Sequence, residues 1–281
     1  MAETPITLIE PTRSLTPLLL REYWQYRDLL YFLTWRDVKV RYKQTLLGVG
    51  WAVLVPLTQM LIFGVIFGKI ARFSSDGLNP FLFYLCGLVP WQYFSNALTL
   101  SSGSLVAQSH LMTKVYFPRI FIPLSACVAS GVDLVIAFAL LVVVILCLGI
   151  VPASTIVLTP LLVLLAFANA LGAGLALSAL SVKYRDIRFV VPFIVQIWMY
   201  GSVLLPFSQL PEPWGAWRYL YAVNPMVGII EGFRWSLLHP AMEGAGPPWL
   251  LLAMGMPATL LLVATGIRVF HRTERQFADT V

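Results

Sequence analysis

The chain has 281 residues and a formal net charge of +6 at neutral pH, with 59% hydrophobic and 11% charged residues. Soluble domains typically carry about 25% charged residues, so this composition excludes an ordinary soluble fold. Residues 134–182 form a run of 49 without Asp, Glu, Lys or Arg. A spanning helix needs about 20 apolar residues, so this run holds two crossings joined by a turn at residues 149–152. The sequence therefore predicts a polytopic membrane protein.

Further apolar windows extend this pattern to an all-α fold with six transmembrane helices. Backbone polar groups cannot stay unpaired in lipid, which favours helices, and the short alternating segments of a membrane barrel are absent. The six expected spans are residues 46–68, 80–101, 121–149, 155–181, 189–208 and 248–267. We divide the chain accordingly into a cytoplasmic N-terminal segment (1–45), a six-helix transmembrane domain (46–267) and a cytoplasmic tail (268–281). The charged first 28 residues contain no apolar run of the signal-peptide type.

The distribution of basic residues predicts which way the chain faces. With the N-terminus inside, fifteen of the nineteen Lys and Arg fall on the inner side of the membrane. The outer side then holds only Lys69, Arg72, Arg218 and Arg234. The positive-inside rule places both termini in the cytoplasm. Because topology explains the basic balance, no nucleic-acid partner is predicted.

Residues 22–43 are expected to form an amphipathic helix at the cytoplasmic interface. An apolar stripe at helical spacing contains Tyr31, Trp35, Val38 and Tyr42. Basic residues lie beside it, at Arg36, Lys39 and Lys43. A helix that is aromatic on one side and cationic on the other suits the headgroup plane of an anionic membrane. The alternative is a helix packed on other protein.

Two short charged segments lie between spans on the inner side. The first runs from His110 to Arg119, and a short helix in it is expected to end near Pro118. The second, from Lys183 to Arg188, is expected to be a compact turn. Either could also be a plain solvated loop.

The outer segment at residues 209–247 predicts a re-entrant hairpin. Its two apolar runs are too short to span the membrane, and they are rich in the Trp and Tyr that favour the membrane interface. An ordinary aromatic belt is the alternative to an outer gate. Glu231 and Arg234 stand at i, i+3, where they can pair across one helix face.

Small residues at regular spacing predict close packing between the spans. Small residues repeat every four positions at Ala166, Ala170, Gly174 and Ser178, and again at Gly64 and Gly68, which indicates close helix packing.

Asp133 is the one charge deep in a span, where it suits either an ion site or a packing hydrogen bond. The second reading is favoured because no other intramembrane acid, His or Lys accompanies it. Its expected partners are Ser130, Asn169 or Gln196.

Neither catalytic nor metal-binding patterns stand out. Gly64–Lys69 fails the spacing of a phosphate-binding loop, and Ile70 follows the Lys. Cys86, Cys127 and Cys147 lie singly in apolar spans and are expected to act as small hydrophobes. We therefore predict no enzyme, no metal site and no cofactor in this chain.

Several motifs, in their order along the chain, resemble the type-2 ABC exporter permeases of the branch that moves lipid-linked polysaccharides such as O antigen, capsule and teichoic acid. The likeness covers about residues 25–270. The motifs that carry it are Arg36–Lys43, Leu47–Trp51 with Pro56, Phe81–Gly87, Pro90-Trp91, Lys114–Arg119, Tyr184–Asp186 and Asn224–Met226.

The resemblance implies a homodimer in the bacterial inner membrane, driven by two copies of a separate ATPase chain that holds ATP and Mg. It assigns ATPase coupling to His110, Lys114, Tyr116, Phe117, Arg119, Lys183 and Arg185. It assigns the interface helix to Arg36, Lys39, Arg41 and Lys43, and the outer gate to residues 211–238.

A hydroxyl-rich glycan needs a hydrated path, and sugars stack on aromatic rings that carry a polar handle. The aromatic side chains proposed for this path are Trp51, Trp91, Tyr93, Trp198, Tyr200, Trp214, Trp217 and Tyr221. Alternatives to glycan export are a type-2 exporter of drugs or small lipids, an integral membrane glycan polymerase or acyltransferase, and a passive channel.

Overall fold

The computed structural model describes residues 24–43, 45–114, 117–204, 207, 210, 215, 217–242 and 246–274. All regular structure in these residues is helical, which confirms the all-α prediction. The α-helices are α2 (Arg27–Lys43), α3 (Gly50–Phe63), α4 (Pro80–Ala107), α5 (Ser109–Lys114), α6 (Phe121–Cys147), α7 (Thr159–Lys183), α8 (Ile187–Met199), α9 (Trp217–Ala222), α10 (Pro225–Leu238) and α11 (Trp249–Glu274). Two π-helices, η1 (Gly64–Ile70) and η3 (Tyr200–Leu204), continue α3 and α8.

Within the described chain, five helical stretches are long and apolar enough to cross a membrane, so the protein is polytopic. They are Gly50–Ile70, Phe121–Cys147, Ser154–Lys183, Ile187–Leu204 and Trp249–Glu274, close to five of the expected spans. The expected span at 80–101 lies in α4, which has 28 residues but carries many polar side chains. The total of six crossings stays a prediction.

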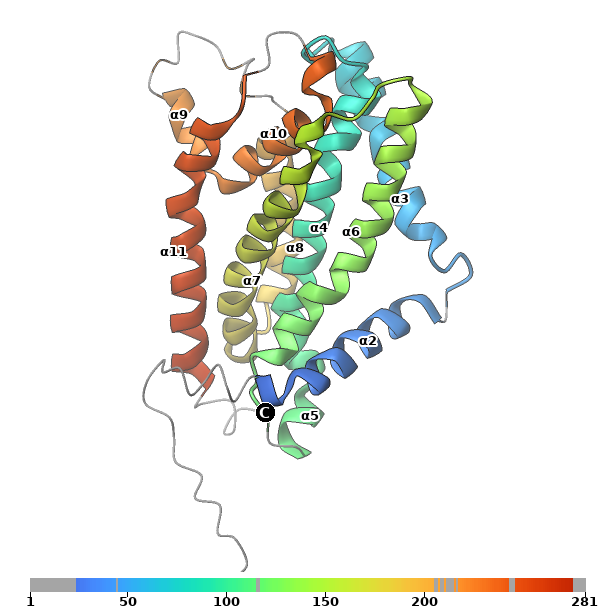
Figure 1. The fold of residues 1–281 in the computed structure, drawn as a ribbon. Coiled ribbons are helices and arrows are strands. Elements are labelled where there is room, and N and C mark those ends of the chain that lie inside the picture. The colour runs from blue at the N-terminus through green and yellow to red at the C-terminus, as the bar shows by residue number, and fades with distance from the viewer. Residues whose placement is uncertain are drawn as a thin grey trace, which may run out of the picture.

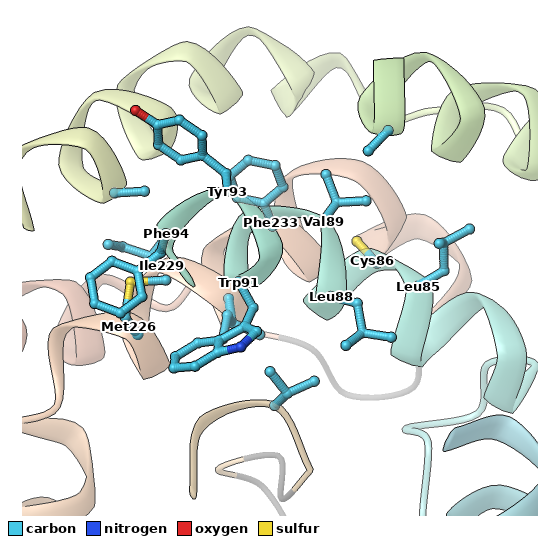
Figure 2. Packing of buried hydrophobic residues seen from close by; sticks show 14 of the residues in the cluster. Leu85, Cys86, Leu88, Val89, Trp91, Tyr93, Phe94, Met226, Ile229 and Phe233 are labelled. Carbon is cyan, nitrogen blue, oxygen red and sulfur yellow. The ribbon is translucent and has the colours of Figure 1, made fainter. Parts of the chain in front are cut away.

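Helix α4 is the centre of the bundle, because α3, α6, α7, α8 and α10 all pack against it. Its first half is almost completely buried, and its apolar side chains join those of α10 in one core (Figure 2). Cys86 and Cys127 are buried and Cys147 is exposed; all three are free thiols. Burial of α4 on nearly every side leaves only a narrow part of its surface uncovered.

Different helices lie at the two ends of the bundle. Helix α5, the start of α2 and the end of α11 lie together at one end (Figure 1). Helices α9 and α10 lie toward the opposite end (Figure 1). Gly48 forms the turn between α2 and α3 with a φ of +51°, a backbone region that favours glycine. This separation is consistent with the predicted inner and outer sides.

Small residues allow the helices to approach closely, as predicted for two of these seams. Ala166, Ala170, Gly174 and Ser178 are buried, and a Cβ built on Gly174 would lie 2.4 Å from the Ser101 hydroxyl of α4. A Cβ on Gly64 would lie 2.3 Å from the Phe81 ring. The sequence analysis missed a tighter contact between α7 and α11, where a Cβ on Gly266 would lie 2.0 Å from the Gly172 carbonyl oxygen.

Replacing Gly266 with alanine is expected to destabilise the protein by about 1–3 kcal/mol, the usual cost of overpacking. The added methyl would meet backbone rather than a flexible side chain, so both helices must shift. Thermal unfolding in detergent, followed by fluorescence, measures the change. The matched control is Gly131→Ala in α6, where a Cβ meets nothing within 4 Å. Equal melting temperatures for both variants would contradict the close crossing.

Candidate functional site

A polar stripe follows the uncovered side of α4. It consists of Gln92, Ser95, Asn96 and Thr99, all half-buried, at helical spacing i, i+3, i+4 and i+7. Helices α3 and α8 flank this side of α4. These residues were not among the predicted site residues, because they are neither charged nor aromatic. The signal was present as amide and hydroxyl residues recurring on one helix face within a charge-free span.

A cavity of about 160 Å³ lies where the stripe meets α3 and α8. Its polar lining comes from Gln59 of α3, from the α4 stripe and from Gln196 of α8. The Oε1 atom of Gln59 is buried and, among the described residues, has no hydrogen-bond partner. Buried amides are normally satisfied, so this atom marks a place suited to water or to a ligand hydroxyl.

A larger cavity of about 350 Å³ adjoins the same stripe, and Gln92 lines both. It lies between α3, α4, α6 and the end of α2, with Trp51, Tyr93, Asn96 and Asp133 in its wall. Within the stripe, the Gln92 Nε2 atom donates a hydrogen bond of 3.1 Å to Asn96 Oδ1. The two cavities therefore form adjacent parts of one region with uncharged polar groups along α4.

Two aromatic rings are in contact one helical turn beyond Gln59 on α3 and Gln196 on α8. The rings of Phe63 and Tyr200 are nearly parallel, with centroids 6.4 Å apart and an angle of 11° between planes. Phe63 ends α3 and Tyr200 begins η3, so the contact lies where both helices change to π geometry. π-helical turns are frequent at functional sites. Phe63 and Tyr200 are thus the candidate outer closure.

The structure places some of the aromatic residues expected to line the path in the walls of the two cavities and others elsewhere. Trp51 and Tyr93 line the larger cavity and Trp91 the smaller one, and Figure 2 shows Trp91 and Tyr93 leaving α4 on opposite sides. Trp198 packs edge-on against Trp91 and Phe94, with centroid distances of 6.1 and 5.1 Å. Tyr221 is half-buried on α9. Trp214 and the Trp217 side chain lie outside the described residues.

Helix α2 runs obliquely past α6 (Figure 1). The end of α2 contacts Asp133, the charge predicted deep in a span. Arg41 forms an ion pair with Asp133, and the Tyr42 hydroxyl donates to the same carboxylate. Burial, and next the hydrogen bond to Asp133, raises the pKa of Tyr42 to about 12, so this hydroxyl stays protonated. The expectation that Asp133 bonds to Ser130, Asn169 or Gln196 is wrong. Sequence spacing could not show that α2 reaches this depth.

The rest of α2 supports both predictions for this helix, contact with a membrane surface and packing on protein. Leu33 is buried against the bundle, and Ser125 of α6 donates to Asp37 at 3.1 Å. Tyr31 and Trp35, by contrast, are 72% and 56% exposed. Arg36 pairs with Asp37 at 2.7 Å, while Lys39 and Lys43 are exposed. One side of α2 therefore packs on protein, and the other offers apolar and basic groups to a membrane surface.

At the inner end, the residues expected to couple to an ATPase differ in exposure. His110, Lys114, Lys183 and Arg185 are exposed; Lys183 ends α7 and Arg185 lies in the turn before α8, which is shorter than the predicted Lys183–Arg188. Phe117 is only 7% exposed, packed in a second core with Leu33 of α2 and Phe270 of α11. The Phe117 ring therefore packs the segment His110–Arg119, called the inner loop below, against the helices. Tyr116 lies outside the described residues.

Arg119 has a role that sequence reasoning did not anticipate. Its Nη1 atom donates to the backbone oxygen of Glu274 at 2.7 Å. The side chain thereby ties the inner loop to the end of α11. Because α11 continues to Glu274, the structure extends this helix beyond the expected boundary at residue 267.

At the outer end, Glu231 and Arg234 form the predicted pair at 2.9 Å. Arg234 is fully buried, so it lies inside the protein rather than in contact with solvent. It also donates to the Val203 oxygen of η3 at 2.8 Å and lies 3.7 Å from the centroid of the Phe83 ring. Glu231 accepts from the Phe207 backbone N–H. This arginine therefore connects α10, α4 and the outer end of α8.

Comparison with known proteins identifies relatives across almost the whole chain. The family model described as ABC-2 type transporter matches residues 28–238. An O-antigen export system permease protein RfbA of Myxococcus xanthus is 29% identical over 94% of this chain and 99% of its own. One of Klebsiella pneumoniae is 28% identical over 90% and 94%. The polysialic acid transport protein KpsM of Escherichia coli is 25% identical over 85% and 91%.

Proposed function

Because this chain belongs to the ABC-2 type transporter family, we propose that it is the permease subunit of an ATP-driven exporter of a lipid-linked polysaccharide. The names of the relatives support this substrate class, since they are permeases for O antigen and a transporter of polysialic acid. ATP and Mg bind a separate partner chain in this proposal. The complex lies in the bacterial inner membrane with both termini of this chain in the cytoplasm.

The observation that carries the proposal is the polar stripe on α4. A glycan exposes many hydroxyl groups and cannot shed their hydrogen bonds to enter hydrocarbon at low cost. Amide and hydroxyl side chains both donate and accept, so they can replace water along the path. The stripe offers these groups without charge, and α3 and α8 leave it open on one side. A second copy of the chain would complete the enclosure.

The packing also suggests how ATP hydrolysis reaches this path. Phe117 and Leu33 share the second core, which joins the inner loop to α2. The far end of α2 holds Asp133 through Arg41, in the wall of the larger cavity. A push on the inner loop would therefore move α2 and the cavity wall together, as packed elements shift between discrete arrangements.

Replacing polar side chains of the α4 stripe with apolar ones is expected to reduce glycan export. In the double variant Gln92→Leu with Thr99→Val, the path loses hydrogen-bonding groups in its wall, and we expect surface glycan to fall about tenfold. The measurement is the amount of surface polysaccharide in a deletion strain complemented with each variant. Permease abundance in the membrane is measured in parallel.

The matched control is Thr265→Val, the same threonine change at an exposed position of α11, where the hydroxyl donates to the backbone oxygens of Leu261 and Leu262. Wild-type export from this control is expected. Wild-type export from the stripe variant would contradict the α4 path. If the deletion leaves surface glycan unchanged, the polysaccharide itself is the wrong substrate, and drugs or small lipids become the substrates to test.

Reversing the exposed charge at the inner end is expected to release the ATPase. In Lys114→Glu with Arg185→Glu, two exposed cations become acids, and we expect co-purification of a nucleotide-hydrolysing partner to fall about tenfold. Arg119 is left unchanged because it binds α11. The control, Lys69→Glu with Arg72→Glu, makes the same change at the opposite end of the bundle. Undiminished partner recovery with the first variant would refute the coupling assignment.

A further inference from the structure

The larger cavity combines the three kinds of side chain that bind a sugar ring. Aromatic surface comes from Tyr93 and from Trp51, which is 52% exposed. Amide groups come from Gln92 and Asn96, which are already hydrogen-bonded to each other and so held in place. The ion pair of Arg41 and Asp133 supplies both a donor and an acceptor. The volume of the larger cavity, about 350 Å³, lies near the lower limit for ligand-binding sites, about 300 Å³.

The charge of this wall favours a neutral ligand over an anionic one. Among the described residues that line the cavity, the acidic and basic side chains are Asp133 and Arg41, which pair with each other. A phosphate would meet the Asp133 carboxylate and would have to compete for the guanidinium. A neutral hydroxyl, by contrast, can accept from Arg41 and donate to Asp133 without disturbing the pair.

The position of the cavity adds a second argument. Gln92 lines this cavity and the smaller polar one, so a ligand here is in line with the α4 stripe. The remaining wall is apolar, from residues such as Val55, Pro56 and Leu134. Apolar surface with a few convergent polar groups fits the C–H faces and hydroxyl edges of a sugar.

We propose that this cavity is a binding subsite for a single neutral sugar residue of the transported glycan, with Trp51 and Tyr93 against the ring and Asn96 and the Arg41–Asp133 pair at its hydroxyls. The subsite rests on the proposed function. It adds a place where the permease itself recognises sugar.

The test is saturation-transfer NMR on the full-length chain in lipid nanodiscs. The probes are D-mannose, D-galactose, L-rhamnose and N-acetyl-D-glucosamine, with mannose 1-phosphate as the anionic comparison. We expect transfer to at least one neutral sugar, and a drop of about fivefold in Trp51→Ala and in Asn96→Leu. The matched control is Trp249→Ala on α11, since Trp249 is also 52% exposed and lies outside the cavity.

Three results would overturn the subsite: no transfer to any of the neutral sugars, equal transfer in wild type and both cavity variants, or stronger transfer to mannose 1-phosphate. Thermal unfolding of each variant shows whether a lost signal comes from misfolding, and Tyr93→Phe provides a further cavity variant that keeps the packing. Surface glycan of the complemented deletion strain separates the two proposals. Restored glycan without sugar binding removes the subsite alone, whereas surface glycan that does not depend on this chain removes the proposed function.

Discussion

Replacing Arg234 with methionine is expected to cost about 3–5 kcal/mol of stability, because it removes one partner of a buried ion pair and leaves the other uncompensated. Arg234 is fully buried, and its guanidinium contacts Glu231, the Val203 oxygen and the Phe83 ring. Methionine fills similar space but satisfies neither oxygen. Unfolding by denaturing detergent, or the level of folded protein in the membrane, measures the loss.

The double variant Glu231→Gln with Arg234→Met separates charge from packing. It leaves no unpaired ion in the core, so most of the lost stability is expected to return. The surface control is Arg72→Met, which removes an exposed arginine just after η1 and should leave stability unchanged. If the double variant is as unstable as Arg234→Met alone, the guanidinium contacts to Val203 and Phe83 matter more than the pairing with Glu231.

The fold could be predicted well because lipid imposes a strong constraint on sequence. Charge-free windows located the helices, although α4 and α11 continue beyond the expected ends at residues 101 and 267. The regular spacing of Ala166 to Ser178 identified a seam of α7. The pair Glu231 and Arg234 followed from one-turn spacing on a single helix. These features are local, so the sequence contains them directly.

The features that sequence reasoning missed depend on contacts between distant segments. Arg41 and Asp133 are 92 positions apart, and their pairing requires the oblique path of α2 over α6. The Gly172–Gly266 crossing likewise joins α7 to α11, a distant segment, through a glycine that lies outside the regular Ala166–Ser178 repeat of α7. The α4 stripe is a different case, since its spacing was visible. The sequence does not show, however, that neighbouring helices cover most of the remaining surface of α4.

Replacing Asp133 with alanine is expected to reduce glycan export at least about tenfold, since it releases the end of α2 and leaves Arg41 without its partner in the cavity wall. Both loss of the helix anchor and loss of the sugar-facing carboxylate act in the same direction. Surface polysaccharide and ATP hydrolysis by the assembled complex are the measurements. Hydrolysis that continues without export would show that the link between α2 and the path has been broken.

A charge-exchange variant, Arg41→Asp with Asp133→Arg, tests whether the pair acts as an anchor. Two residues in direct contact are expected to show a coupling free energy of about 0.5–3 kcal/mol in a double-mutant cycle with the single variants. Recovery of export in the exchange variant would mean that the link between α2 and α6 suffices. Recovery of stability without export would mean that the carboxylate must lie at its own position in the cavity wall. Additive losses in both measurements would refute the pairing of Arg41 with Asp133 as the connection between the inner loop and the path.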